Sequence, residues 1–397
     1  MTSSAGSAIL SERGHARVRT NSASTTAEQA AYVGVDVPMT LAAELRPRAL
    51  GVGTAVTPTS YTQQEVLDTF EITDPKIRSV FLNSAIERRH LTLPPSDGAG
   101  GRVHEPQGDL LDKHKAMAIE MGAEALRACL KRAGAELSDL RHLCCVTSTG
   151  LLTPGLSALL IKELDIDRHC SRSDIVGMGC NAGLNALGVV SGWAAAHPGE
   201  LAVVLCTEAC SAAYTMDSTM RTAVVNSLFG DGAAAIAIRS GSAPNDAPVP
   251  EGPRILKFAS CLIPDAVDAM RYDWDRDQGR FSFYLDPQVP YVVGAHAEPA
   301  VDRLLADTGL RRSDIAHWLV HSGGKKVIDA VALNLGLTRH DVRHTVGVLR
   351  DYGNVSSGSF LFSYERLLDE AVAQPGEYGV LMTMGPGSTI ETALVQW

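Results

Sequence analysis

The stretch GMGCNAGLNALGVVSGWAAA, residues 177–196, decides the fold. From Cys180 onward it is apolar or small on every side of a helix, with few polar interruptions. A helix without a polar face must be enclosed by protein. The sequence therefore predicts a buried helix over residues 180–196, ended by His197-Pro198-Gly199, inside a large core.

Strands and helices alternate on both sides of this helix. Before it, the pattern predicts a strand at Arg48–Val56, a helix at Asp109–Ala133 and a buried strand run ending at Gly150. After it come strand runs at 200–209, 233–240, 317–321, 378–384 and 390–396, with helices at 325–336 and 359–373. Such alternation predicts α/β layers with partly parallel sheets.

A Pro-, Gly- and Asn-rich segment, Ser242–Pro253, divides the chain. It suggests two halves of similar construction, residues 46–245 with the buried helix and residues 246–397. Residues 1–45 are rich in Ser, Thr and Ala and have almost no hydrophobic period. We expect a disordered tail there, with a transit peptide as the alternative.

Composition excludes several classes of protein. The 397 residues carry a formal net charge of -10 without a concentrated basic stretch, which disfavours nucleic acid as a partner. No apolar run approaches the roughly 20 residues of a membrane span. The eight cysteines match no zinc pattern, and no secretory segment is visible. We expect a cytoplasmic protein without a metal site or disulfides.

The candidate nucleophile is Cys180, in the turn GMGCNAG between a strand and the buried helix. The flanking glycines permit a tight turn and the close approach of a ligand. A helix N-terminus favours the thiolate, which is the nucleophilic form of cysteine. The alternative is a buried and inert thiol.

Two other strand-to-helix junctions carry His321 and Asn354. His321 ends an apolar strand, where open α/β sheets place ligands, and Asn354 lies in the loop DYGNVSSGS before a helix. Alone, each has an ordinary explanation, a histidine satisfied by backbone contacts and a turn or N-cap asparagine.

Together, the three residues suit nucleophilic acyl transfer. Cysteine can carry an acyl group as a thioester, and the other two can donate N–H groups to an oxyanion. Papain-like proteases also use cysteine, histidine and asparagine, but the sequence context of their cysteine is absent here.

Five segments resemble signature segments of type III polyketide synthases, the chalcone-synthase-like members of the thiolase superfamily. They are GMGCNAG (177–183), LFGDGAAA (228–235), HSGGKKVIDA (321–330), GNVSSGS (353–359) and MGPGSTIET (384–392). The resemblance implies a five-layered αβαβα fold built from two similar halves. It also implies a homodimer and coenzyme A (CoA) thioesters as substrates, with no metal or organic cofactor.

A narrower resemblance concerns the bacterial members that serve glycopeptide antibiotic biosynthesis. It rests on segments such as DPKIRSVFLNSAIERR (74–89), EPQGDLLDKHK (105–115) and DAVDAMRYDWDRDQ (265–278). It implies that four malonyl-CoA molecules are condensed on Cys180 to 3,5-dihydroxyphenylacetyl-CoA, while His321 and Asn354 stabilise the enolate. Helper enzymes of the same pathway are further candidate partners.

The resemblance also implies substrate-binding residues. Lys76 and Arg78 would meet the CoA phosphates, and Tyr214 and Phe283 would form an aromatic gate. Thr153 would enter the partner subunit's cavity, and the loop Gly385-Pro386-Gly387 would border the site. The chain departs from the family pattern at Thr383-Met384, where Gly-Phe is usual, and at Asn83, where lysine is common.

Two other functions stay open at this point. A ketoacyl-acyl-carrier-protein synthase III has the same three residues and the same fold, but Gly385-Pro386-Gly387 and the sequence HSGG argue against it. A non-catalytic partner protein of thiolase fold is the second alternative, and the intact set of Cys180, His321 and Asn354 argues against that.

Overall fold

The computed structural model describes residues 45–98, 101–214, 217, 219–241 and 252–397. Most of the expected tail, residues 1–44, and most of the expected linker, residues 242–251, lie outside the described residues.

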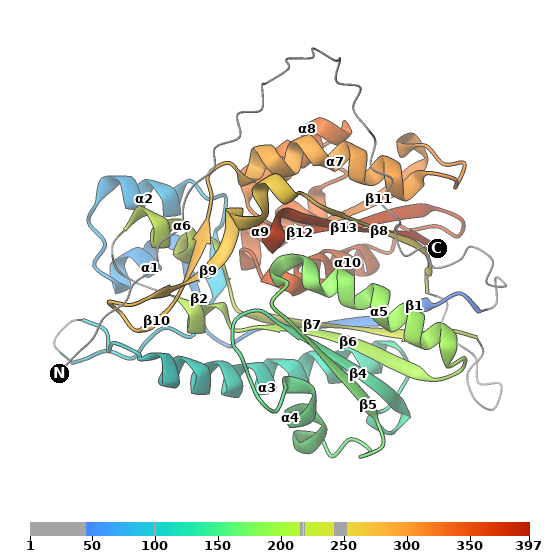
Figure 1. Cartoon of the computed structure of the whole chain (residues 1–397), viewed down its shortest axis with the longest axis horizontal. Helices are drawn as coiled ribbons and strands as arrows, with labels where there is room; N and C mark the ends of the chain where they lie inside the picture. Colours follow the sequence, from blue (N-terminus) through green and yellow to red (C-terminus); the bar gives the residue numbers. More distant parts are fainter. Residues whose placement is uncertain (1–44, 99–100, 215–216, 218, 242–251) are drawn as a thin grey trace, which may run out of the picture. The chain divides into compact units, whose positions relative to one another are not determined.

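The described part of the chain is organised around one mixed sheet, whose strands follow the order β11-β12-β13-β8-β1-β7-β6-β4-β5 (Figure 1). The strands are β1 (Arg48–Ala55), β4 (Leu140–Thr147), β5 (Ser171–Val176), β6 (Leu201–Glu208), β7 (Gly232–Arg239), β8 (Arg254–Leu262), β11 (Ile315–Val320), β12 (Tyr378–Gly385) and β13 (Thr389–Gln396). The strands expected from the apolar runs are thus all present.

Strand order and direction repeat in the two halves of the sheet. In the first half β4 runs parallel to β6, and β6-β7-β1 are antiparallel neighbours. In the second half β11 runs parallel to β12, and β12-β13-β8 are antiparallel neighbours. Strands β1 and β8 join the halves through the pair Arg48 and Arg254. The repeat agrees with two halves of similar construction.

Helices cover the sheet in three layers (Figure 1). Helices α5 (Ala182–Ala196) and α10 (Ser359–Glu370) lie between the two halves of the sheet and share one apolar core with both. Helices α3 (Gln107–Arg132) and α4 (Leu156–Glu163) pack on the outer face of the first half. Helices α7 (Val289–Leu305) and α8 (Lys325–Leu335) pack on the outer face of the second. The expected five-layered αβαβα fold is confirmed. Helix α5 packs against both halves, but it is not enclosed on every side as its sequence predicted, because the face that carries Val189, Gly192 and Ala196 is exposed.

Smaller elements gather beyond the ends of the layers. They are α1 (Gln63–Thr69), α2 (Pro75–Leu82), α6 (Met220–Leu228), the ribbon β2 (Ser60–Thr62) and β3 (Arg88–His90), and the hairpin β9 (Met270–Asp275) and β10 (Arg280–Leu285). Helix α9 (Arg343–Tyr352) packs against α10 and β3. Within the described ranges, no helix is long and apolar enough to cross a membrane.

Candidate active site

Cys180 lies in a tight turn between β5 and α5. The turn needs glycine, because Gly177 and Gly179 have φ angles of 85° and 69°. Cys180 then falls in one turn of 3-10 helix, Gly179–Asn181, at the N-terminus of α5. Cys180 is 8% exposed as a residue, and its Sγ lies 3.6 Å from the hydroxyl oxygen of Ser356.

The environment of Cys180 favours the thiol over the thiolate. Burial raises the pKa of the Cys180 thiol to about 12, and the nearby Glu208 carboxylate adds to this, while Ser356 and Asn354 oppose it. The helix N-terminus was expected to favour the thiolate, whereas burial acts in the opposite direction. Cys180 must therefore lose a proton when it attacks an acyl group.

His321 follows the last residue of β11, and its backbone N–H donates to the carbonyl of Met382 over 2.8 Å. Burial lowers the pKa of the imidazole to about 3, so the ring is neutral at physiological pH. Nδ1 is enclosed and has no hydrogen-bond partner among the described residues, which leaves Nε2 available to the cavity. A neutral imidazole can donate from one nitrogen or accept a proton.

The amide of Asn354 is oriented by its own loop. Its Oδ1 accepts the backbone N–H of Ser356 over 2.9 Å and the hydroxyl of Ser359 over 3.4 Å. With the oxygen occupied in this way, the NH₂ group is left to donate toward the cavity. The same NH₂ group favours the Cys180 thiolate, so the two side chains are neighbours.

Cys180, His321 and Asn354 line one cavity of about 450 Å³. Its wall comes from α2, α6, the β9–β10 hairpin, the starts of α7 and α8 and the Asn354 loop. Phe283 lies on this wall, edge-on to Phe229 with ring centroids 5.8 Å apart. The structure thus brings the three chemical residues and one of the two expected gate residues together.

Tyr214 lies elsewhere than the resemblance implied. It is buried, its hydroxyl oxygen accepts from Arg89 Nη1 over 2.6 Å, and its hydroxyl donates to the carbonyl of Phe229. Tyr214 is not among the residues that line the cavity. Phe229 lines the cavity instead, next to Phe283.

The two basic residues expected to bind CoA, Lys76 and Arg78, do not line the cavity. Lys76 is exposed on α2, and the guanidinium of Arg78 donates to Ile72 O and to Gln64 Oε1. Helix α2 presents Ser79, Val80 and Asn83 to the cavity, whereas Arg78 lies on its other face. Lys76 lies on the same face as the lining residues, at the N-terminal end of the helix, but does not itself line the cavity. The basic residues on the cavity wall are Lys325 and Lys326, at the N-terminus of α8. Both lie in the segment HSGGKKVIDA, but the sequence alone did not indicate them as CoA-binding residues.

The loop Gly385-Pro386-Gly387 packs against the turn that carries Cys180. A Cβ on Gly385 would lie 3.0 Å from the Cys180 nitrogen, and one on Gly179 would lie 2.4 Å from Pro386 Cδ. These residues therefore shape the turn by close packing, and Met384 is the neighbour that reaches the cavity. Thr153 is exposed on the loop between β4 and α4 and does not line its own chain's cavity.

A buried polar network lies behind Cys180. Glu208 is fully buried and accepts the backbone N–H of Ser148 over 2.9 Å and the hydroxyl of Ser357 over 2.5 Å. Thr149 also donates to this carboxylate and lies 3.2 Å from Nδ1 of His114 in α3. The network thus connects the Asn354 loop to the loop that carries Thr153. Glu208 was not a sequence candidate, since a lone glutamate at the end of a strand gives no signal.

His114 makes the stability of the fold depend on pH. Burial lowers the pKa of its imidazole to about 4, whereas in the unfolded chain the pKa is about 6.5. Between these values only the unfolded chain binds the proton, so stability is full above about pH 6.5 and falls as the pH approaches 4. Between pH 7 and pH 4.5, we expect the free energy of unfolding of His114→Gln to fall by about 2 to 3 kcal/mol less than that of the unmodified chain. Urea unfolding at the two pH values measures this difference.

The exposed His340 provides the matched control, because its side chain is solvated in the folded chain as well. His340→Gln should leave the difference between the two pH values unchanged. An equal pH dependence in His114→Gln and in the unmodified chain would contradict the role given to His114.

Fold and site together define a thiolase-like acyl-transfer enzyme. Two family models match the chain, the N-terminal domain of chalcone and stilbene synthases over residues 106–244 and their C-terminal domain over residues 259–397. The chain therefore belongs to the chalcone and stilbene synthase family, the type III polyketide synthases.

Individual relatives are more similar still. A 3,5-dihydroxyphenylacetyl-CoA synthase of Streptomyces toyocaensis is 82% identical over 352 residues, 89% of this chain and 90% of the relative. A second, of Amycolatopsis balhimycina, is 74% identical over 92% of this chain and 100% of the relative. Among solved structures, 1,3,6,8-tetrahydroxynaphthalene synthase from Streptomyces coelicolor A3(2) superposes with a TM-score of 0.79, at 28% identity, over 88% of this chain and 99% of that one.

Proposed function

We propose that this chain condenses four molecules of malonyl-CoA to 3,5-dihydroxyphenylacetyl-CoA. The observation that carries the proposal is the meeting of Cys180, neutral His321 and the oriented amide of Asn354 on one cavity wall. The relatives that carry this enzyme name, one of them 82% identical, supply the product.

Decarboxylation is the first step. A thioester oxygen placed between His321 and Asn354 receives two N–H donors, which stabilise the enolate formed when carbon dioxide leaves. The mostly apolar wall, with Phe229, Met270 and Leu285, strengthens these donors by excluding water. The chemistry uses the CoA thioester alone, so no metal or organic cofactor enters it.

Condensation requires an acyl group beside the enolate. Neutral His321 accepts the proton of the Cys180 thiol at Nε2, the sulfur attacks the starter thioester, and CoA leaves as a thiolate that is protonated in solvent. The proton kept on Nε2 is then the N–H that His321 donates to the oxygen of the incoming thioester. The enolate carbon then attacks the cysteine thioester, and the cysteine sulfur leaves. Repetition gives an eight-carbon chain, since each malonyl unit keeps two carbons. Aldol closure and loss of one water form the ring, a stage at which helper enzymes of the pathway would act.

The carrier of the malonyl unit separates this function from that of a ketoacyl-acyl-carrier-protein synthase III. We expect the purified chain to release labelled carbon dioxide from malonyl-CoA without any acyl carrier protein. Release only after the carrier protein is added would favour the synthase III alternative. The absence of release under both conditions would favour a non-catalytic partner.

We propose that Lys325 and Lys326 meet the CoA phosphates, since both are exposed and line the cavity. We expect Lys326→Ala to raise the KM for malonyl-CoA about fivefold, because a charge-assisted contact at an exposed site contributes about 1 kcal/mol. Lys76→Ala tests the expectation from the sequence that Lys76 and Arg78 bind the CoA phosphates. If Lys76→Ala raises KM and Lys326→Ala does not, the phosphates bind along α2 instead.

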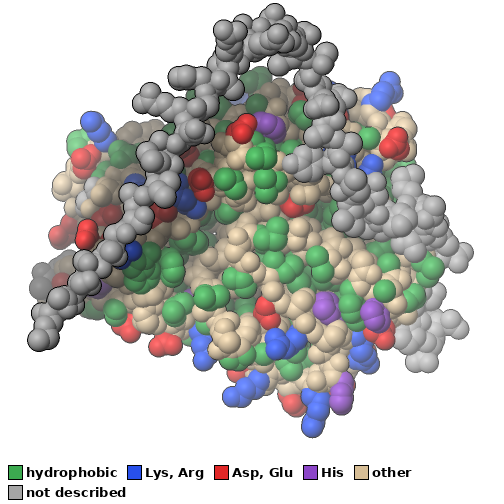
Figure 2. Space-filling view, viewed as in Figure 1, with side chains coloured by type: hydrophobic (Ala, Val, Ile, Leu, Met, Phe, Trp, Pro, Cys, Tyr) green, Lys and Arg blue, Asp and Glu red, His purple; other side chains and the backbone are tan. Residues whose placement is uncertain are grey.

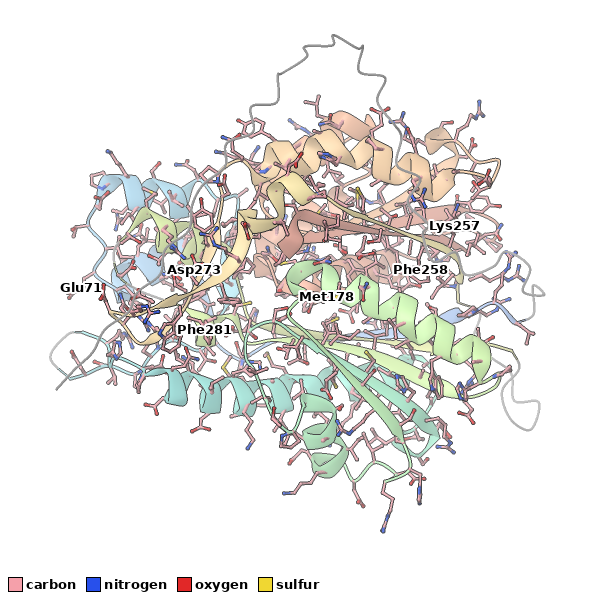
Figure 3. The ribbon with its side chains drawn as sticks, in the orientation of Figure 1. Glu71, Met178, Lys257, Phe258, Asp273 and Phe281 are labelled. Atoms are coloured by element: carbon pink, nitrogen blue, oxygen red, sulfur yellow. The ribbon has the colours of Figure 1, made fainter. Side chains whose placement is uncertain are left out.

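We also propose a homodimer formed through the face over β5, α5 and β8. Figure 2 shows that hydrophobic and uncharged side chains gather at the centre of this face, and Figure 3 places Met178 and Phe258 on it. Strand β5 ends the sheet with an edge open to pairing, and exposed apolar residues on or beside these elements include Leu151, Val176, Val189 and Leu262. Thr153 would then reach the partner's cavity.

We expect light scattering to give twice the 42.1 kDa mass of one chain, and Val189→Glu to yield monomers that make no aromatic product. Leu333→Glu is the control, because Leu333 is 82% exposed on α8, on the outer face of the other half. A fully active monomer would contradict the shared site.

We place the reaction in the cytoplasm, where CoA thioesters and reduced thiols occur, and all eight cysteines are free.

A further inference from the structure

Arg89, on β3, carries a guanidinium that is completely buried. Its Nη1 lies 2.6 Å from each of three oxygens, the hydroxyl of Tyr214 and the carbonyls of Asn226 and Phe229. Its Nη2 donates to Gln63 Oε1 over 2.8 Å. One side chain thus holds both the last turn of α6 and the segment that follows it.

Asn354 is attached to the same segment. Its backbone N–H donates to the carbonyl of Leu228 over 2.9 Å, and its carbonyl accepts the N–H of Gly230 over 3.0 Å. The two bonds form a parallel bridge between Asn354 and Phe229, the residue whose carbonyl accepts from Arg89. The position of the asparagine backbone is therefore set by a segment that Arg89 holds.

The stem of Arg89 also lies directly against the asparagine turn. A Cβ on Gly353, which has a φ of 72°, would be 2.8 Å from Arg89 Cδ and 2.9 Å from Cγ. The arginine thus supports this turn by packing as well as through the hydrogen bonds of its guanidinium. A lysine would keep the charge, but its single ammonium could not bridge the same acceptors in a plane.

We propose that Arg89 is a positioning residue for decarboxylation, which holds the Asn354 amide at the distance the enolate oxygen requires. This inference rests on the proposed function, because it assigns Asn354 to the thioester oxygen. It also gives Tyr214 a role in this cluster, since the phenol joins Arg89 to the Phe229 carbonyl.

A double-mutant cycle tests the inference. Arg89→Lys should lower kcat for carbon dioxide release from malonyl-CoA about tenfold or more with KM unchanged, because small misplacements of a catalytic group cost up to about 10²-fold. In the Asn354→Ala background the same change should cost less than about twofold, since the amide to be positioned is gone. An equal fold-loss in both backgrounds, or no loss in either, would overturn the proposal.

Two further variants keep the test decisive. Arg239→Lys, on β7, changes a half-buried arginine at the end of the strand remote from the site and should leave kcat unaltered. If Arg89→Lys does not fold, Tyr214→Phe carries the same cycle, with an expected loss of roughly threefold that disappears in Asn354→Ala. A loss that persists there, or no loss at all, overturns the proposal. If the unmodified chain releases no carbon dioxide, the proposed function fails first.

Discussion

Replacing Asn354 by alanine is expected to reduce decarboxylation of malonyl-CoA by about 10²–10³-fold, the usual cost of one oxyanion donor. The amide is buried, its oxygen is occupied by Ser356 N–H, and its nitrogen is therefore committed to the cavity. Because no water can replace it in the same geometry, the loss should appear in kcat. Release of labelled carbon dioxide under saturating malonyl-CoA measures it.

Ser359→Ala is the matched control for this result. Ser359 donates to the same Oδ1, but over 3.4 Å, near the limit of a hydrogen bond. Its removal should cost less than about threefold, because Ser356 N–H still orients the amide. If Asn354→Ala decarboxylates at the native rate, the enolate is stabilised by other groups.

Replacing Cys180 by alanine should separate the two reactions. Decarboxylation depends on the donors at the thioester oxygen, so carbon dioxide release should stay within about threefold of the native rate. Condensation needs an acyl group held beside the enolate, and without the covalent link the aromatic product should fall by at least about 100-fold. Parallel assays of carbon dioxide and product thioester distinguish the two effects.

Cys261→Ala is the comparison for a general effect of losing a thiol, since Cys261 lies half-buried on β8 and away from the cavity wall. It should preserve both activities. Aromatic product from Cys180→Ala at a rate close to native would show that the chain grows without attachment to the cysteine.

The layers of the fold could be predicted from the sequence because periodicity and burial coincide there. Helix α5 has no polar face and packs between the two halves, and the strand runs 378–384 and 390–396 became β12 and β13. The one exposed face of α5, with Val189, is apolar, so its sequence did not distinguish it from a buried face. The β9–β10 hairpin was not predicted, although Tyr272 and Trp274 alternate with Asp273 and Asp275 at the period of a strand. It is held by cross-strand contacts such as Trp274 on Phe281, with ring centroids 5.0 Å apart.

Cys180 and His321 could be predicted because each lies at a junction between a strand and a helix. Asn354 was expected at a third such junction, but it lies between helices α9 and α10, and only its Gly- and Ser-rich loop indicated it. The protonation states of Cys180 and His321 could not be predicted, since their burial depends on elements distant in the sequence. The direction of a side chain is equally a tertiary property. Tyr214 turns toward Arg89 and Arg78 toward Gln64, for reasons that no local motif contains.

The most direct test is to incubate the purified chain with uniformly labelled ¹³C-malonyl-CoA as the only substrate and to identify the product by mass spectrometry. The account predicts 3,5-dihydroxyphenylacetyl-CoA with eight labelled carbons in the acyl group, two from each of four malonyl units, and four labelled carbon dioxides per product. A requirement for another acyl-CoA starter, or an acyl group that does not contain eight labelled carbons, would contradict it.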